Sequence, residues 1–268
     1  MFHIIKAVFL RDFRFQISYK LSYFTELFFA FLLIFFLFFL SNSFNFAEES
    51  MYSKFKGDFF LYSITGFSIV NVMGQCYGSV INNLRESQSF GYIEEMYTSD
   101  NKFIFLSIAP VFYAFVKSSI RLIIIFGISW YLAGSILNIF NLILLLVLCF
   151  ITLIGFIGIS LLGISIILVF KKGDYLSLIF IGGSFLISGA IYPNEVLPEI
   201  LIKISEVLPL THTLELTRDL LILENSSSLN YISMLKLISL SSLYLVCGYT
   251  VAIKSLKYAR KKGIFSDY

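Results

Sequence analysis

Side chains with catalytic or metal-binding chemistry are scarce in this sequence. It contains two histidines, His3 and His212, and neither belongs to a cluster with the spacing of a metal site. Its three cysteines, at positions 76, 149 and 247, are dispersed through apolar segments, so we interpret them as small hydrophobic residues. No glycine-rich loop of the form GxxxxGK followed by Ser or Thr is present. We therefore expect no nucleotide hydrolysis by that route and no cofactor bound by this chain.

Glu94 and Glu95 form an adjacent acidic pair that resembles the paired glutamates of some intramembrane proteases. Those proteases also need an arginine four residues further on and histidines in later membrane spans. Here Asp100 and Asn101 follow the pair, and no predicted span contains a histidine. An intramembrane hydrolase therefore stays a minor alternative.

The composition predicts an all-α integral membrane protein that forms a single transmembrane domain over residues 1–268. Hydrophobic residues make up 58% of the chain and charged residues only 14%, against roughly 25% charged residues in soluble domains. Apolar windows long enough to cross a bilayer predict six transmembrane helices, at about 24–40, 59–80, 118–132, 140–170, 175–192 and 231–253. We expect no ionisable residue deep inside these spans, which argues against an ion-coupled carrier.

Residues 1–22 are basic and loosely amphipathic, which predicts a helix in the membrane interface. Ile5, Phe9 and Phe13 recur at four-residue spacing, while Arg11 and Arg14 are expected to point away from them. A signal peptide is the alternative, but the basic region is long for one and the following Ser-Asn-Ser is a poor cleavage site.

The distribution of lysine and arginine predicts the orientation in the membrane. With a cytoplasmic N-terminus, most of these cations fall in cytoplasmic segments. The predicted external segments hold only Lys54, Lys56, Lys203 and Arg218, with Lys236 near the outer end of the last span. We therefore expect a multi-pass protein of the cytoplasmic (inner) membrane with both termini in the cytoplasm.

Three of the four prolines fall in one stretch before the last span, at Pro193, Pro198 and Pro209. Proline is tolerated in the first turn of a helix, so each is expected to start a short helix. The apolar positions between residues 196 and 208 recur at three to four residues, and Glu199 precedes Lys203 by four, which predicts an amphipathic helix of about three turns. Residues 193–222 are predicted to form an external helical hairpin that re-enters the membrane; a surface helix in a loop is the alternative.

Residues 82–118 are predicted to form a cytoplasmic region between the second and third spans. A short helix is expected at 89–98, with Ile93, Met96 and Tyr97 on one apolar edge. A connecting helix follows at 102–117 and is expected to be interrupted by Pro110.

The order of these parts resembles the permease subunit of type-2 ABC exporters over nearly the whole chain. The first cytoplasmic motif of that family appears as Arg85-Glu86 followed by Gly91-Tyr92-Ile93-Glu94-Glu95-Met96. The second appears as Ser188-Gly189, Tyr192-Pro193, Leu197-Pro198, Leu208-Pro209-Leu210-Thr211, Leu214-Glu215 and Arg218. Two positions depart from the pattern: Thr98-Ser99-Asp100 lacks the usual proline, and Leu208 replaces an asparagine.

The resemblance implies a permease dimer, most simply a homodimer, above two separate ATP-binding subunits that carry the ATP and Mg. The residues implied to couple the chain to these subunits are Gly91, Tyr92, Ile93, Glu94, Glu95, Met96 and Tyr97. The residues implied to form an external gate are Gly189, Tyr192, Pro193, Pro198, Pro209, Thr211, Glu215 and Arg218. The chain itself is then not an enzyme, and no nucleic acid is expected as a partner.

The expected function is ATP-driven export of an amphipathic, drug-like or lipid-linked compound. Export of a polysaccharide or teichoic acid is the alternative within the same family, because aromatic residues are abundant throughout and do not discriminate between the two. A membrane scaffold that transports nothing is the alternative from a different class.

Overall fold

The computed structural model describes residues 2–43, 59–91, 103–134, 138–170, 174–222 and 230–262, and in these segments every regular element is a helix. This confirms the predicted all-α class. The elements are α1 (Phe2–Ser18), α2 (Lys20–Ser43), α3 (Phe59–Ser89), α5 (Phe103–Ile108), α6 (Pro110–Leu132), α7 (Ile139–Phe170), α8 (Asp174–Ile187), the 3₁₀ helix η4 (Asn194–Val196), α9 (Glu199–Ser205), α10 (Pro209–Leu221) and α11 (Tyr231–Lys262).

Five helical segments are long and apolar enough to cross a membrane, and they match five of the six predicted spans. They are Tyr23–Ser43, Phe59–Ser89, Phe103–Leu132, Ile139–Val169 and Tyr231–Ala259. The predicted span at 175–192 corresponds to α8, which has only 14 residues. At 1.5 Å per residue α8 is about 21 Å long, less than the roughly 30 Å of the hydrocarbon core. The helix ends early because Gly189, two residues beyond it, has a φ of 77°.

The third span is longer than the prediction of 118–132, because Pro110 does not break the helical path. Proline at the first position of α6 loses no helical hydrogen bond, and Ala109 before it keeps helical angles of −50° and −38°. The Ala109 amide still donates to the Phe105 carbonyl oxygen at 2.9 Å. Consequently the predicted connecting helix and the predicted span form one helical segment from Phe103 to Leu132.

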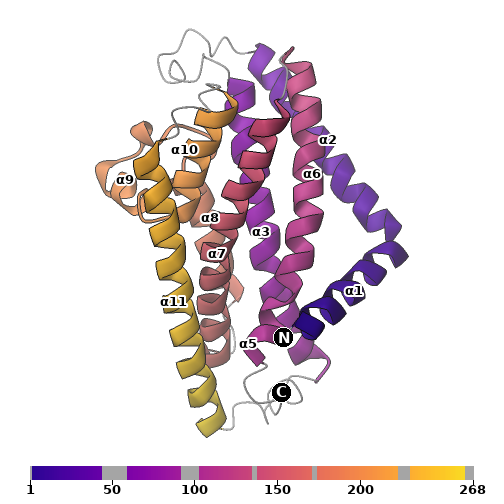
Figure 1. The fold of residues 1–268 in the computed structure, drawn as a ribbon, viewed down its shortest axis with the longest axis vertical. Coiled ribbons are helices and arrows are strands. Elements are labelled where there is room, and N and C mark those ends of the chain that lie inside the picture. The colour runs from indigo at the N-terminus through magenta and orange to yellow at the C-terminus, as the bar shows by residue number, and fades with distance from the viewer. Residues whose placement is uncertain are drawn as a thin grey trace.

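Helix α3 lies at the centre of the bundle, where it contacts α2, α6, α7 and α10. In its apolar window 72% of the residues are buried, against 11% for α2 and 22% for α11. Figure 1 shows α2 and α11 on opposite sides of the bundle. These outer helices therefore present their large apolar side chains, such as Phe29 and Leu235, to the surroundings, as expected in a membrane.

Helix α1 meets α2 at a bend around Tyr19 and crosses the bundle obliquely beside α6 (Figure 1). It packs mainly on α6 and α5. Arg11, expected to point away from the packed face, instead donates to the Asn83 side chain of α3 at 3.4 Å while also pairing with Asp12 at 2.8 Å. Helices α9 and α10 lie toward the opposite end of the bundle from α1 and α5.

Small residues allow α7 and α11 to approach closely. A Cβ atom added at Gly158 of α7 would collide with the carbonyl of Tyr244, and one added at Gly248 of α11 would collide with the carbonyl of Gly158. Such contacts between small residues are typical of helix pairs in membranes. This packing makes α7 and α11 the most extensive helix pair among the described elements.

We expect Gly158→Ala to lower the thermal stability of the purified protein, because the added methyl group forces the α7 and α11 backbones apart. Overpacking of this kind costs about 1–3 kcal/mol. Gly127→Ala on α6 is the matched control, because no atom lies within 4 Å of its added Cβ and alanine favours helix. The measurement is the melting temperature of each protein in detergent. If both variants melted at or above the temperature of the parent, the assigned contact would be wrong.

Candidate functional site at the α9–α10 hairpin

The centre of the hairpin is the guanidinium of Arg218, which is only 3% exposed. It lies on α10 and donates to the carbonyl oxygens of Gly189 and Ala190, both at 2.9 Å, and to that of Tyr62 at 3.3 Å. Gly189 and Ala190 follow the C-terminal end of α8, where carbonyl groups lack partners within the helix and a cation is favoured. Arg218 therefore joins α10 to the end of α8.

Tyr62 of α3 completes this arrangement from the other side. Its ring lies beneath the guanidinium, with 3.5 Å between the Arg218 Cζ atom and the ring centroid. Its hydroxyl donates to the Gly189 carbonyl oxygen at 3.0 Å. Cation–π contacts of this kind are strongest when desolvated. We call Tyr62, Gly189, Ala190 and Arg218 the Arg218 cluster; it connects α3, the turn after α8, and α10.

Glycine is required at two positions beside the Arg218 cluster. At Gly189 the φ of 77° is unfavourable for other residues, and an added Cβ would collide with the Asn194 side chain. At Gly66 of α3 an added Cβ would collide with the Ala190 carbonyl oxygen. These two glycines let the turn after α8 lie directly against α3.

The prolines stand where the sequence predicted, at helix starts. Pro209 is the first residue of α10, and Pro193 and Pro198 immediately precede η4 and α9. The predicted single amphipathic helix of three turns is wrong. The chain is extended at Leu197 and Pro198, since a residue before proline disfavours the helical region, and this separates η4 from α9.

The two halves of the hairpin differ in burial. On α10 every residue except Glu215 and Asp219 is buried, and the helix packs among α3, α7 and α11. On α9 the apolar side chains of Ile200 and Ile204 are exposed. Helix α10 is therefore an interior element of the bundle, whereas α9 presents an apolar face to the surroundings. The predicted gate residue Tyr192 lies near the surface and donates through its hydroxyl to the Leu186 carbonyl oxygen at 2.8 Å.

A polar cavity of about 520 Å³ borders α10, and Pro193, Thr211, Glu215 and Arg218 are among the residues that line it. The Glu215 carboxylate accepts a hydrogen bond from Ser233 of α11 at 3.0 Å and lies 3.8 Å from the His212 ring. The nearby His212 ring, and then Ser233, lower the pKa of Glu215 against the opposing effect of burial. Burial, and then the Glu215 charge, raise the pKa of Asp219.

Of the predicted coupling residues, the structure places only Gly91. It ends α3 with a φ of 74°, in a turn where the Phe90 amide donates to the Glu86 carbonyl oxygen at 2.9 Å. Glycine in this conformation is a common helix terminator. The other coupling residues lie outside the described residues: Tyr92, Ile93, Glu94, Glu95, Met96 and Tyr97.

A charged cluster inside the spans contradicts the expected absence of ionisable residues there. Glu26 of α2 accepts from Lys117 at 2.8 Å and from Arg121 at 3.1 Å, and both cations lie on α6. Arg121 also donates to Asn71 of α3. The four-residue spacing of Lys117 and Arg121 places them on one helix face, and this spacing could have predicted a charged cluster from the sequence. It was obscured because residues 102–117 were taken for a separate connecting helix.

Together these features define a multi-pass helical membrane protein with a helical hairpin packed into its bundle. The model of the ABC-2 type transporter family matches residues 1–222, which is most of the chain. The chain therefore belongs to the ABC-2 type transporter family, as its motifs suggested. It is a membrane permease domain, and such a domain does not itself hydrolyse ATP. No curated protein sequence gave a significant match.

We expect Arg218→Lys to destabilise the protein although it keeps the charge. An ammonium group cannot reproduce the planar fork that reaches three carbonyl oxygens. Each buried acceptor left without a donor lowers the free energy of unfolding by about 1–3 kcal/mol.

Tyr62→Phe removes one hydroxyl donor and should lower the free energy of unfolding by about 1 kcal/mol.

The matched control is Lys203→Gln, which changes an exposed cation on α9 of the same hairpin. Thermal unfolding of the three variants in one detergent compares them. An Arg218→Lys protein as stable as the Lys203→Gln control would show that the Arg218 cluster does not hold the hairpin.

Proposed function

We propose that the chain is the membrane-spanning subunit of an ATP-driven exporter, working as a dimer with separate ATP-binding subunits. The observation that carries this proposal is the position of α3. Its first turn bears Tyr62 of the Arg218 cluster, and its last residues lead into Gly91 and the coupling motif. Over its 31 residues α3 is about 45 Å long. One buried helix thus joins the proposed coupling segment to the hairpin.

The proposed orientation places the termini and the coupling segment in the cytoplasm and the hairpin on the outer side. It is supported by the excess of lysine and arginine in the predicted cytoplasmic segments. It also agrees with the location of α9 and α10 away from α1 and α5 (Figure 1). In this arrangement α8 is the sixth membrane crossing. It is short, and the hairpin fills the remaining depth on the outer side.

The proposed mechanism is a change between two packed states. Closure of the ATP-binding subunits displaces the segment from Gly91 to Tyr97, and α3 carries that displacement to Tyr62. Because Tyr62 contacts both Arg218 and Gly189, a shift of α3 alters the support of α10 and of the turn after α8. The hairpin then moves, and a path opens between the two permease copies.

An amphipathic, drug-like or lipid-linked cargo suits a path between two copies better than a sugar polymer does. The outer faces of the bundle, which such a path would follow, carry large exposed apolar side chains, for example Phe29 of α2 and Leu235 of α11. A polysaccharide needs many hydrogen-bonding groups along its path, and these apolar side chains offer none.

The coupling assignment is tested with the triple change Tyr92→Ala, Ile93→Ala and Met96→Ala. Truncating this apolar edge should weaken seating on the ATP-binding subunit, so transport should fall at least tenfold while the permease still folds. Transport into vesicles and ATPase activity of the co-purified complex are the measurements. If both were unchanged, the assigned coupling segment would be wrong.

The hydrolase alternative is tested with the double change Glu94→Gln and Glu95→Gln. If these carboxylates only contact the partner or solvent, transport should persist within a few-fold of the parent, because exposed charge pairs contribute about 0–1 kcal/mol. Loss of all activity, with complex formation intact, would instead favour a chemical role for the pair.

A further inference from the structure

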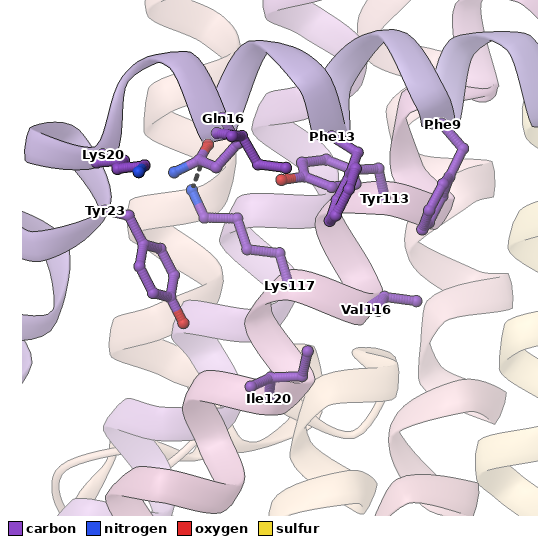
Figure 2. Close-up of a pocket in the computed structure, with 10 residues that line it drawn as sticks. Phe9, Phe13, Gln16, Lys20, Tyr23, Tyr113, Val116, Lys117 and Ile120 are labelled. Carbon is purple, nitrogen blue, oxygen red and sulfur yellow. Dashed lines mark hydrogen bonds between the residues drawn. The ribbon is translucent and has the colours of Figure 1, made fainter.

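A second pocket, of about 350 Å³, lies between α1, the start of α2, and α6 (Figure 2). None of its lining residues belongs to the hairpin or to the predicted coupling segment. One part is apolar: Phe9 and Phe13 extend from α1 toward Val116 and Ile120 of α6.

The apolar part of this pocket is incompletely covered. Phe13 is 47% exposed and Ile120 is 50% exposed, although both face the pocket. Phe9 is held in place by an edge-on contact with Tyr113 of α6, with 5.4 Å between ring centroids. A hydrocarbon chain lying between α1 and α6 would cover these side chains.

The other part of the pocket gathers hydrogen-bond donors at the α1–α2 bend. Figure 2 shows Gln16, Lys20 and Lys117 together there, with the Tyr23 ring beside Lys117. Lys117 donates to Gln16 Oε1 at 3.3 Å and to Glu26 at 2.8 Å, which uses two of its three N–H bonds. The Gln16 side-chain oxygen accepts that bond, which fixes the orientation of the amide group. The amide nitrogen, a donor, is buried and has no hydrogen-bond partner among the described residues.

The charges around this part favour an anion. Lys117 and Arg121 share the single carboxylate of Glu26, so these three buried or half-buried side chains carry an excess positive charge. Lys20 on the pocket wall adds another cation. The nearby acid on α1, Asp12, is already paired with Arg11 at 2.8 Å. An uncompensated charge at a half-buried site is costly, so an anionic ligand is favoured.

We propose that this pocket binds an anionic phospholipid of the surrounding bilayer. The phosphate lies against Gln16, Lys20 and Lys117, and part of one acyl chain lies between Phe9, Phe13 and Ile120. Basic pockets between transmembrane helices on the cytoplasmic side are suited to such headgroups; this location rests on the orientation proposed above. The bound lipid holds α1 against α6.

The test measures lipid binding to the purified permease alone, by native mass spectrometry and thermal unfolding, with phosphatidylglycerol or phosphatidylcholine added. Phosphatidylglycerol should stabilise the protein and phosphatidylcholine should not. Lys20→Gln should weaken phosphatidylglycerol binding about fivefold, the effect of one cation at an anionic lipid surface. Lys254→Gln, an exposed cation on α11 at the α1 end of the bundle, is the matched control and should bind as the parent does.

A second variant, Val116→Phe, fills the apolar part and should reduce phosphatidylglycerol binding without unfolding the protein. Equal stabilisation by inorganic phosphate alone would show a simple anion site, and equal stabilisation by phosphatidylcholine would show an apolar site without charge selectivity; either result overturns the proposal. Equal losses in Lys20→Gln and Lys254→Gln would overturn it too. No ATP-binding subunit or transport is involved, so failure of the export function would leave this result unaffected.

Discussion

The packing of the hairpin depends on one buried cation that has backbone carbonyl groups as its partners. Arg218 needs acceptors because a desolvated guanidinium is costly, and the turn after α8 needs donors because its carbonyl oxygens have left the helix. Each requirement satisfies the other, and the Tyr62 ring packs against the guanidinium with 3.5 Å between the Arg218 Cζ atom and the ring centroid. Three elements distant in sequence therefore become one unit, and the close approach at Gly66 and Gly189 is a condition for it.

Helix α3 is fixed by polar contacts at several levels, including Asn83 near its last turns, which accepts from Arg11 and donates to the Leu106 carbonyl oxygen. Toward its first turn Tyr62 joins the Arg218 cluster, and further along Asn71 accepts from Arg121, which itself pairs with Glu26. Between and beyond these levels it is packed on α6 and α7 through apolar side chains. Charged contacts have directional geometry and apolar packing resists compression. A helix held in both ways is suited to move as a rigid body, which the proposed mechanism requires.

Hydropathy and proline positions were enough to predict the helical class, five of the long helices, and the helix starts at Pro193, Pro198 and Pro209. The length of α8 could not be predicted, because apolar residues continue past Gly189 and composition does not reveal its positive φ. Lys117 was assigned to a separate connecting helix and Arg121 to the span after it, because Pro110 was taken to interrupt the helical path, so their common face was missed. The acceptors of Arg218 could not be foreseen, since Gly189 lies 29 residues away and contributes only backbone atoms.

The short helix α8 has a consequence for the membrane around the protein. In the arrangement proposed above, α8 crosses the membrane with a length of about 21 Å, less than the roughly 30 Å of the hydrocarbon core. The bilayer beside it then becomes thinner, or the hairpin replaces the lipids there. The exposed apolar face of α9, with Ile200 and Ile204, is suited to lie at the boundary of such a thinned region. In that arrangement, a molecule crossing next to α8 would meet a thinner hydrocarbon barrier than one crossing beside α2 or α11. This side of the protein is then the one expected to respond to the acyl-chain length of the membrane.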